Sequence, residues 1–193
     1  MGYHTEFGGD FHLDKPLAKE HALFLHAFSE TRRMKRDPLK IDKRGRDYHA
    51  QAGLTLGPEG AYFVNGADSS SEGPSVVCYN TPPAGQPELW CSWAPASQDD
   101  PKYVVPTCIS EEEIEAGAEC WHIKWNGAEK FYSYVEWLDY LILNFLEPWG
   151  YKLNGQVNWR GEYFWDQGTI LVTDNFVDKL IRRVPFRRVE DSA

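Results

Sequence analysis

Five acidic residues in the second half of the chain are spaced so that they could serve one chemical site. They are Glu129, Glu136, Asp139, Glu162 and Asp166. Two carboxylates that meet in a cleft can transfer protons or bind a divalent cation. Acidic residues also commonly cover the wet side of a helix, and Glu129 stands at capping-box spacing from Asn126. A structural role is therefore favoured, and an acid/base or metal-dependent enzyme is the second alternative for function.

Histidine and cysteine give weaker catalytic signals. His122 shares one side of a predicted strand with Cys120, but no carboxylate has the local spacing to activate it. His21 lies in an apolar helical stripe, which favours a core histidine with one hydrogen bond. The chain has no phosphate-binding loop, dinucleotide fingerprint, zinc-protease motif or serine-hydrolase elbow. We therefore expect no catalytic residue, no metal and no cofactor, and favour a protein that is not an enzyme.

Aromatic residues give the strongest functional signal. The chain has eight tryptophans. Trp121, Trp125 and Trp159 alternate with apolar residues and are expected in the core, whereas Trp90 and Trp93 fall on opposite faces of one predicted strand. Exposed indoles anchor protein interfaces and stack on bases. The predicted binding residues are Trp90, Trp93, Trp149, Trp165, Tyr132, Glu136 and Asp139.

Basic residues are concentrated in two segments of an acidic chain. The formal charge is −9, yet residues 32–46 carry eight basic and two acidic residues, and residues 182–188 carry four basic ones. These segments could contact phosphate or an acidic surface, or they could simply be solvated. The candidate contacts are Arg32, Arg33, Lys35, Arg36, Arg44, Arg46, Arg182 and Arg183. They make a nucleic-acid or nucleotide binder the first alternative for function.

The length of 193 residues fits one domain, 1–193. The start lacks a signal peptide, and no apolar run approaches the roughly 18 residues that span a bilayer. Four cysteines without a closely spaced pair indicate reduced thiols rather than disulfides or a zinc site. We expect a cytoplasmic protein that does not associate with membranes.

Hydrophobic periodicity predicts an α+β fold with a two-layer arrangement, in which two principal helices pack on one face of a mainly antiparallel sheet. The first helix is expected from Asp14 to just before Asp37-Pro38, with cations in its last turn, and the second from Asn126 to Pro148. The expected strands are 5–13, 61–64, 75–79, 89–93, 120–125, 155–161, 169–173 and 176–184. The other expected parts are an irregular basic connection at 37–60, a surface excursion at about 94–119 and a basic tail at 182–193.

Several segments resemble uncharacterised small acidic proteins of bacteria and their phages. They include Glu129-Lys130-Phe131-Tyr132, Pro148-Trp149-Gly150-Tyr151 and Asn154-Gly155-x-Val157-x-Trp159-x-Gly161-Glu162, with further runs at 31–37, 57–64 and 82–91. The resemblance implies a bacterial or phage origin and a cytoplasmic setting, and it assigns no functional residue.

The leading hypothesis is a non-enzymatic module that binds another macromolecule, and a protein is the favoured partner. Aromatic anchors on an acidic body can mimic nucleic acid toward a basic protein. The hypothesis is a phage or prophage accessory protein that inhibits or modulates a host protein.

Overall fold

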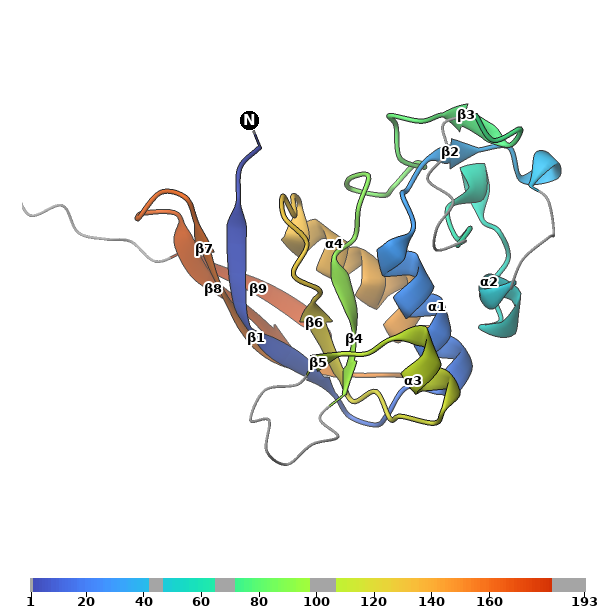
Figure 1. Ribbon diagram of the computed structural model, residues 1–193. Coiled ribbons are helices and arrows are strands. Elements are labelled where there is room, and N and C mark those ends of the chain that lie inside the picture. The colour runs from blue at the N-terminus through green and yellow to red at the C-terminus, as the bar shows by residue number, and fades with distance from the viewer. Residues whose placement is uncertain (1, 42–46, 65–71, 98–106, 182–193) are drawn as a thin grey trace, which may run out of the picture.

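The computed structural model describes residues 2–41, 47–64, 72–97 and 107–181. Its main feature is a seven-stranded sheet with the order β5-β4-β6-β1-β7-β8-β9, in which neighbouring strands pair antiparallel (Figure 1). The strands are β1 (Thr5–Leu13), β4 (Trp93–Ser97), β5 (Thr107–Cys108), β6 (His122–Trp125), β7 (Leu153–Gly161), β8 (Gln167–Thr173) and β9 (Phe176–Ile181). The mixed fold with a mainly antiparallel sheet is therefore confirmed.

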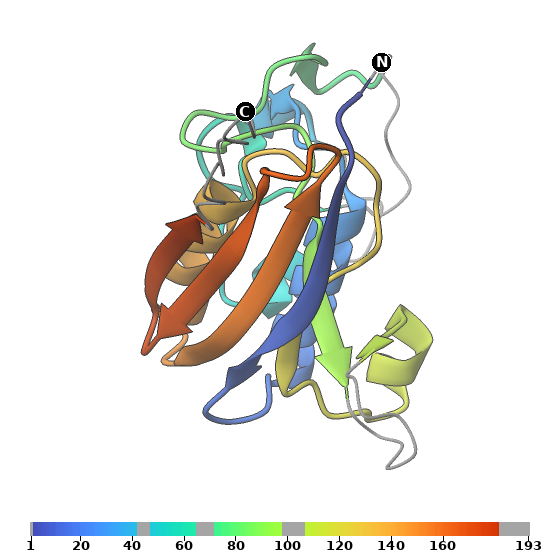
Figure 2. The ribbon, with the colours of Figure 1, turned by 90° about the vertical axis from the view of Figure 1, so that its left-hand side faces the viewer.

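Two helices cover one face of this sheet. They are α1 (Lys19–Glu30) and α4 (Tyr134–Leu141), and α4 continues into the π-helical turn η3 (Ile142–Leu146). Figure 2 looks onto the open face of the sheet, with both helices behind it. Phe24 and Phe28 of α1 meet Phe145 of η3 at ring-centroid distances of 5.0 and 5.3 Å. The aromatic side chains thus join the two helices into one core.

A third region lies beyond α1, on the side away from the sheet (Figure 1). It contains the two-stranded sheet of β2 (Lys35–Arg36) and β3 (Val76–Cys78), the short helix α2 (Tyr48–Gln51) and the 3₁₀ turns η1 (Pro38–Lys40) and η2 (Pro58–Gly60). The described part of the predicted basic connection thus holds short helices. Because of this region, the two-layer arrangement is not confirmed.

The first helix is shorter at both ends than predicted. It begins at Lys19 because the Asp14 carboxylate accepts a hydrogen bond from the Lys152 N–H, 2.9 Å away, and so belongs to the loop beside β7. At the other end Thr31 is extended, and the next residues donate backbone hydrogen bonds to distant segments, such as Arg33 N–H to the Leu89 carbonyl. The prediction that cations occupy the last turn of this helix is therefore wrong.

The second helix begins eight residues later than predicted. Residues 126–133 form an irregular loop in which Lys130 and Ser133 both have positive φ, so Asn126 and Glu129 do not form a capping box. Phe131 is buried against Phe7 and Trp93, and this contact holds the loop across the sheet instead of in a helix. In the helical segment that does form, Trp137, Leu138, Leu141, Ile142 and Phe145 are buried, whereas Tyr134 and Val135 are only partly buried.

Two strand predictions fail and the others hold within a few residues. Residues 61–64 form turns, and the strand expected at 89–93 begins at Trp93 and continues to Ser97. The strand β4 is buried throughout, so residues 94–97 are not a surface excursion. Farther along the expected excursion at 94–119, the short helix α3 (Glu111–Glu115) begins with a capping box formed by Ser110 and Glu113.

Two further sequence-based expectations can be compared with the structure. None of the four cysteines, all of which lie in described segments, forms a disulfide, as predicted. Among the described residues, no helix combines the length and apolar character needed to cross a membrane. The predicted basic tail, 182–193, lies outside the described residues.

Candidate functional site

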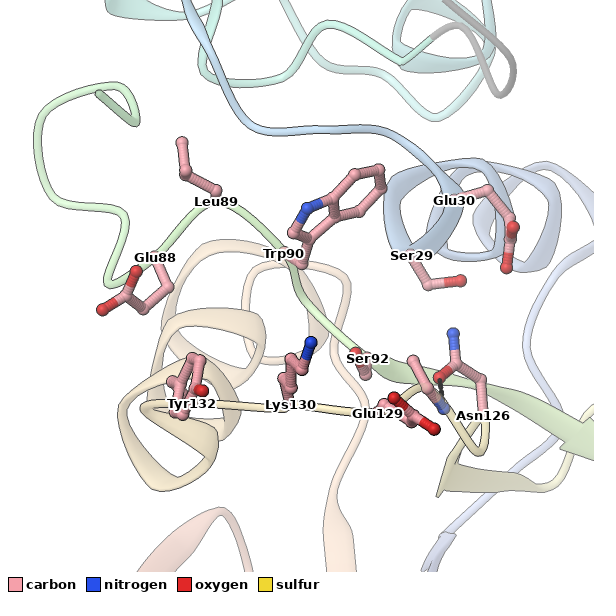
Figure 3. A pocket seen from close by; sticks show the side chains of 11 residues that line it. Ser29, Glu30, Glu88, Leu89, Trp90, Ser92, Asn126, Glu129, Lys130 and Tyr132 are labelled. Carbon is pink, nitrogen blue, oxygen red and sulfur yellow. Dashed lines mark hydrogen bonds between the residues drawn. The ribbon is translucent and has the colours of Figure 1, made fainter. Parts of the chain in front are cut away.

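A cavity of about 540 Å³ opens between the end of α1, the segment that leads into β4, and the loop between β6 and α4 (Figure 3). Its volume lies in the range of roughly 300–1,000 Å³ that is usual for ligand pockets. The lining residues are Ser29, Glu30, Glu88, Leu89, Trp90, Ser92, Asn126, Ala128, Glu129, Lys130 and Tyr132. We call this cavity the Trp90 pocket.

The position of Trp90 follows from how its neighbours are held. Trp93, three residues later, is buried in the core, and its indole N–H donates a 2.8 Å hydrogen bond to the Tyr134 carbonyl. The intervening backbone is fixed on both sides, because Leu89 O accepts from Arg33 N–H and Ser92 O accepts from Asn126 N–H. With this segment anchored, Trp90 is left 41 % exposed on the pocket wall.

The opposite wall is the loop between β6 and α4. The Asn126 side chain accepts a 3.1 Å hydrogen bond from the Ala128 N–H, and the Trp125 indole donates to the Ala128 carbonyl. Phe131 points into the core, which leaves Tyr132 43 % exposed. The Tyr132 hydroxyl accepts a 3.0 Å hydrogen bond from the Tyr3 N–H. The loop therefore holds Tyr132 at the pocket without any helical structure.

Charge around the pocket is unbalanced. Three carboxylates, Glu30, Glu88 and Glu129, line it together with one ammonium group, Lys130. Within the described part of the chain, none of the four forms an ion pair or a side-chain hydrogen bond. Unpaired charges in a cleft concentrate the electrostatic field there, so the pocket attracts positively charged groups.

The structure brings two of the predicted aromatic residues together and separates the others. Trp90 and Tyr132 both line the pocket. Trp93 is buried, and Trp149 stacks on the His21 ring with centroids 4.0 Å apart. Trp165 is 54 % exposed in the turn between β7 and β8 and lies outside the pocket lining.

The three tryptophans that were expected in the core differ in how far they are buried. Trp159 is buried, and Trp125 is partly buried against the core. Trp121 is exposed, and its indole N–H donates to the Glu119 carboxylate, 2.9 Å away. The expectation of a core position is therefore wrong for Trp121.

The candidate carboxylates do not converge. Glu136 and Asp139 are exposed on α4, where partial burial and the charge of Glu136 raise the pKa of Asp139. Glu162 accepts a hydrogen bond from the His4 N–H, and Asp166 accepts from the Tyr3 hydroxyl. Only Glu129 lines the Trp90 pocket. Among the described residues, no three acidic, histidine or cysteine side chains are grouped so that they could hold a metal.

A carboxylate that local spacing in the sequence did not predict lies beside His122. Asp10 of β1 is 2.7 Å from the His122 Nδ1, because the pairing of β1 with β6 places the two residues on neighbouring strands. The register of a sheet, which local spacing does not reveal, creates this contact. Cys120 is buried, and its thiol contacts the Ala118 carbonyl. The sequence-based reason for setting this histidine aside was therefore incomplete.

Two of the four described basic candidates are internal. Arg33 and Arg36 are buried, with their guanidinium carbons 4.1 and 4.3 Å from the ring centroids of Phe28 and Phe63. Lys35 pairs with Glu59 at 2.9 Å, and Arg32 lies 4.1 Å from the ring centroid of Tyr79. These contacts give the four residues a structural role in the region around β2 and β3. The other candidates, Arg44, Arg46, Arg182 and Arg183, lie outside the described residues.

Comparisons with protein-family models, with curated proteins and with solved structures gave no match to this chain.

Proposed function

We propose that this protein is a non-enzymatic binding module that captures another protein in the Trp90 pocket. One observation carries the proposal: exposed Trp90 and Tyr132, from separate segments of the chain, meet at a cavity whose charged side chains are unpaired. Tryptophan and tyrosine dominate the binding energy of many interfaces, since they bury large areas at low conformational cost.

The biological setting that we propose follows from the sequence resemblance. It is a phage or prophage accessory role in the bacterial cytoplasm, in which the module inhibits or modulates a host protein. The formal charge of −9 supports a basic surface on that partner, because opposite potentials speed association and exclude acidic competitors.

Capture from a bacterial lysate tests the proposal when it is compared between variants. Trp90→Ala and Tyr132→Ala should each reduce retention of a specific protein by about tenfold or more, since hot-spot residues contribute about 2 kcal/mol. Trp165→Ala is the matched control, because it removes an indole of similar exposure outside the pocket. Circular dichroism would show that each variant is folded.

Equal retention by the wild-type protein and both pocket variants would refute the proposal. A nuclease arm tests the alternative of a nucleic-acid binder. Nucleic acid that co-purifies, disappears with nuclease and shows a steep salt dependence would favour that alternative. The buried positions of Arg33 and Arg36 count against it for the described basic residues.

A further inference from the structure

We infer that the Trp90 pocket accepts a cationic side chain, specifically an arginine of the partner protein. This inference rests on the proposed function, and it adds the chemistry by which the partner is recognised. It follows from the carboxylates, the exposed indole and a buried serine that line one cavity.

The carboxylates supply the charge complementarity. Glu30 comes from the end of α1, Glu88 from the segment before β4, and Glu129 from the loop before α4, so they surround the opening from three directions (Figure 3). Against three acidic groups the lining has one basic group, Lys130, which leaves an excess of two negative charges. A bound cation would pair with carboxylates that are otherwise without a partner in the described structure.

The indole supplies a surface on which a guanidinium can stack. Trp is the best cation–π partner among the aromatic residues, and Arg uses it more often than Lys. Arg32 already lies 6.0 Å from the Trp90 ring centroid, but its guanidinium is held by hydrogen bonds to the Tyr79 carbonyl and the Asn80 side chain. Arg32 is therefore engaged outside the pocket lining, and the pocket itself remains available to a second cation.

A buried serine in the lining offers a hydrogen-bond acceptor. Ser29 is buried and lines the pocket, and its hydroxyl donates a 2.8 Å hydrogen bond to the His26 carbonyl. Because the proton is used in that bond, the Ser29 oxygen presents lone pairs and can accept from an incoming N–H. A planar guanidinium has five donors and can reach such an acceptor and a carboxylate together, which an ammonium group does less well.

Replacing Lys130 tests whether the bound ligand carries a positive or a negative charge. Its ammonium group shares the lining with the carboxylates and opposes a cationic ligand. Lys130→Gln should therefore strengthen the binding of a cation, whereas Glu88→Gln and Glu129→Gln should weaken it. An anionic ligand would give the opposite sign in all three variants.

The first experiment is a titration of the ¹⁵N-labelled full chain, followed through the indole N–H signals. The Trp90 signal is assigned by its loss in Trp90→Phe. The probes are the N-acetyl methylamides of arginine, lysine, leucine and glutamate. The arginine probe should shift the Trp90 signal at the lowest concentration, and each of the Glu→Gln changes should weaken it about 1.5- to 5-fold.

Glu147→Gln is the matched control, because Glu147 is exposed and lies outside the pocket lining. This variant should bind the arginine probe like the wild-type protein. The inference is overturned if the leucine probe binds as tightly as the arginine probe, if the glutamate probe binds best, or if no probe shifts the Trp90 signal. The capture assay is independent, so a loss of capture in Trp90→Ala would preserve the proposed function even then.

Discussion

Replacing Arg33 should destabilise the protein strongly, because this buried cation joins three segments of chain. Arg33 is 1 % exposed. Its Nη2 donates to the carbonyls of Ala61 and Phe63, at 2.9 and 2.8 Å, and its Nε donates to the Gln86 side chain, at 3.3 Å. Burial lowers the pKa of Arg33 to about 10, so the group is still charged at neutral pH.

Arg33→Ala lowers the free energy of unfolding through the loss of hydrogen bonds and of packing. The Ala61 carbonyl keeps a second donor in Gln86, whereas the Phe63 carbonyl loses the donor described above, which costs roughly 1–3 kcal/mol. The lost side-chain methylenes add about 0.8 kcal/mol each. Release of the buried charge offsets part of this sum. We expect the free energy of unfolding to fall by about 3–5 kcal/mol.

A methionine at the same position separates packing from hydrogen bonding. Arg33→Met refills most of the volume and still leaves the Phe63 carbonyl without this donor, so it should cost about 2 kcal/mol less than alanine. Arg32→Met, next in sequence and only half-buried, is the control and should cost less than about 1 kcal/mol. Urea unfolding measures all three. The reasoning is refuted if Arg33→Ala lies within about 1 kcal/mol of the wild-type protein, since the unpaired Phe63 carbonyl and the lost packing should together cost more than that.

Three further predictions concern side chains in the core and the turns. Burial lowers the pKa of His21, so the unfolded chain binds more protons and stability falls as pH drops through 6.5; His21→Gln should flatten this part of a melting-temperature profile. Asn175 has φ +72, and its side chain forms hydrogen bonds with two backbone groups, so Asn175→Ala should lower the free energy of unfolding in urea by about 2–3 kcal/mol. Asp174 has φ +47, a conformation that glycine adopts easily, so Asp174→Gly should leave the free energy of unfolding unchanged or raise it. Hydrogen bonds lower the pKa of the Cys78 thiol and burial raises that of Cys91 to about 12, so mass spectrometry should find iodoacetamide on Cys78 first.

Elements whose signals are local were predictable from the sequence. The strand β1 was predicted with its observed bounds, Thr5–Leu13. The strands of the β8–β9 hairpin were predicted at 169–173 and 176–184, and the two residues left between them, Asp174 and Asn175, both adopt the positive φ that these residue types tolerate. In these places each local preference agrees with the final fold.

Helix ends were not predictable, because contacts distant in sequence set them. The segment after Thr31 is pulled into an extended path by hydrogen bonds to the Leu89 and Thr81 carbonyls. The cations there looked like a favourable helix end, yet Arg33 donates to the carbonyls of Ala61 and Phe63, and Arg36 donates to the Ser75 hydroxyl. No periodicity in residues 32–36 contains that information.

The Trp90 pocket forms where predictions of regular structure failed. Trp90 was expected in a strand and Tyr132 on a helix, and both expectations placed the side chains outside the core. The exposure is as expected, but its cause is different: Trp93 and Phe131 turn inward from irregular segments and leave their neighbours outside. A strand or helix would have carried these aromatic groups on separate elements, whereas the irregular segments allow them to face one cavity. Departure from the local pattern is therefore the feature that assembles the pocket, as is common where sequence preferences yield to a functional site.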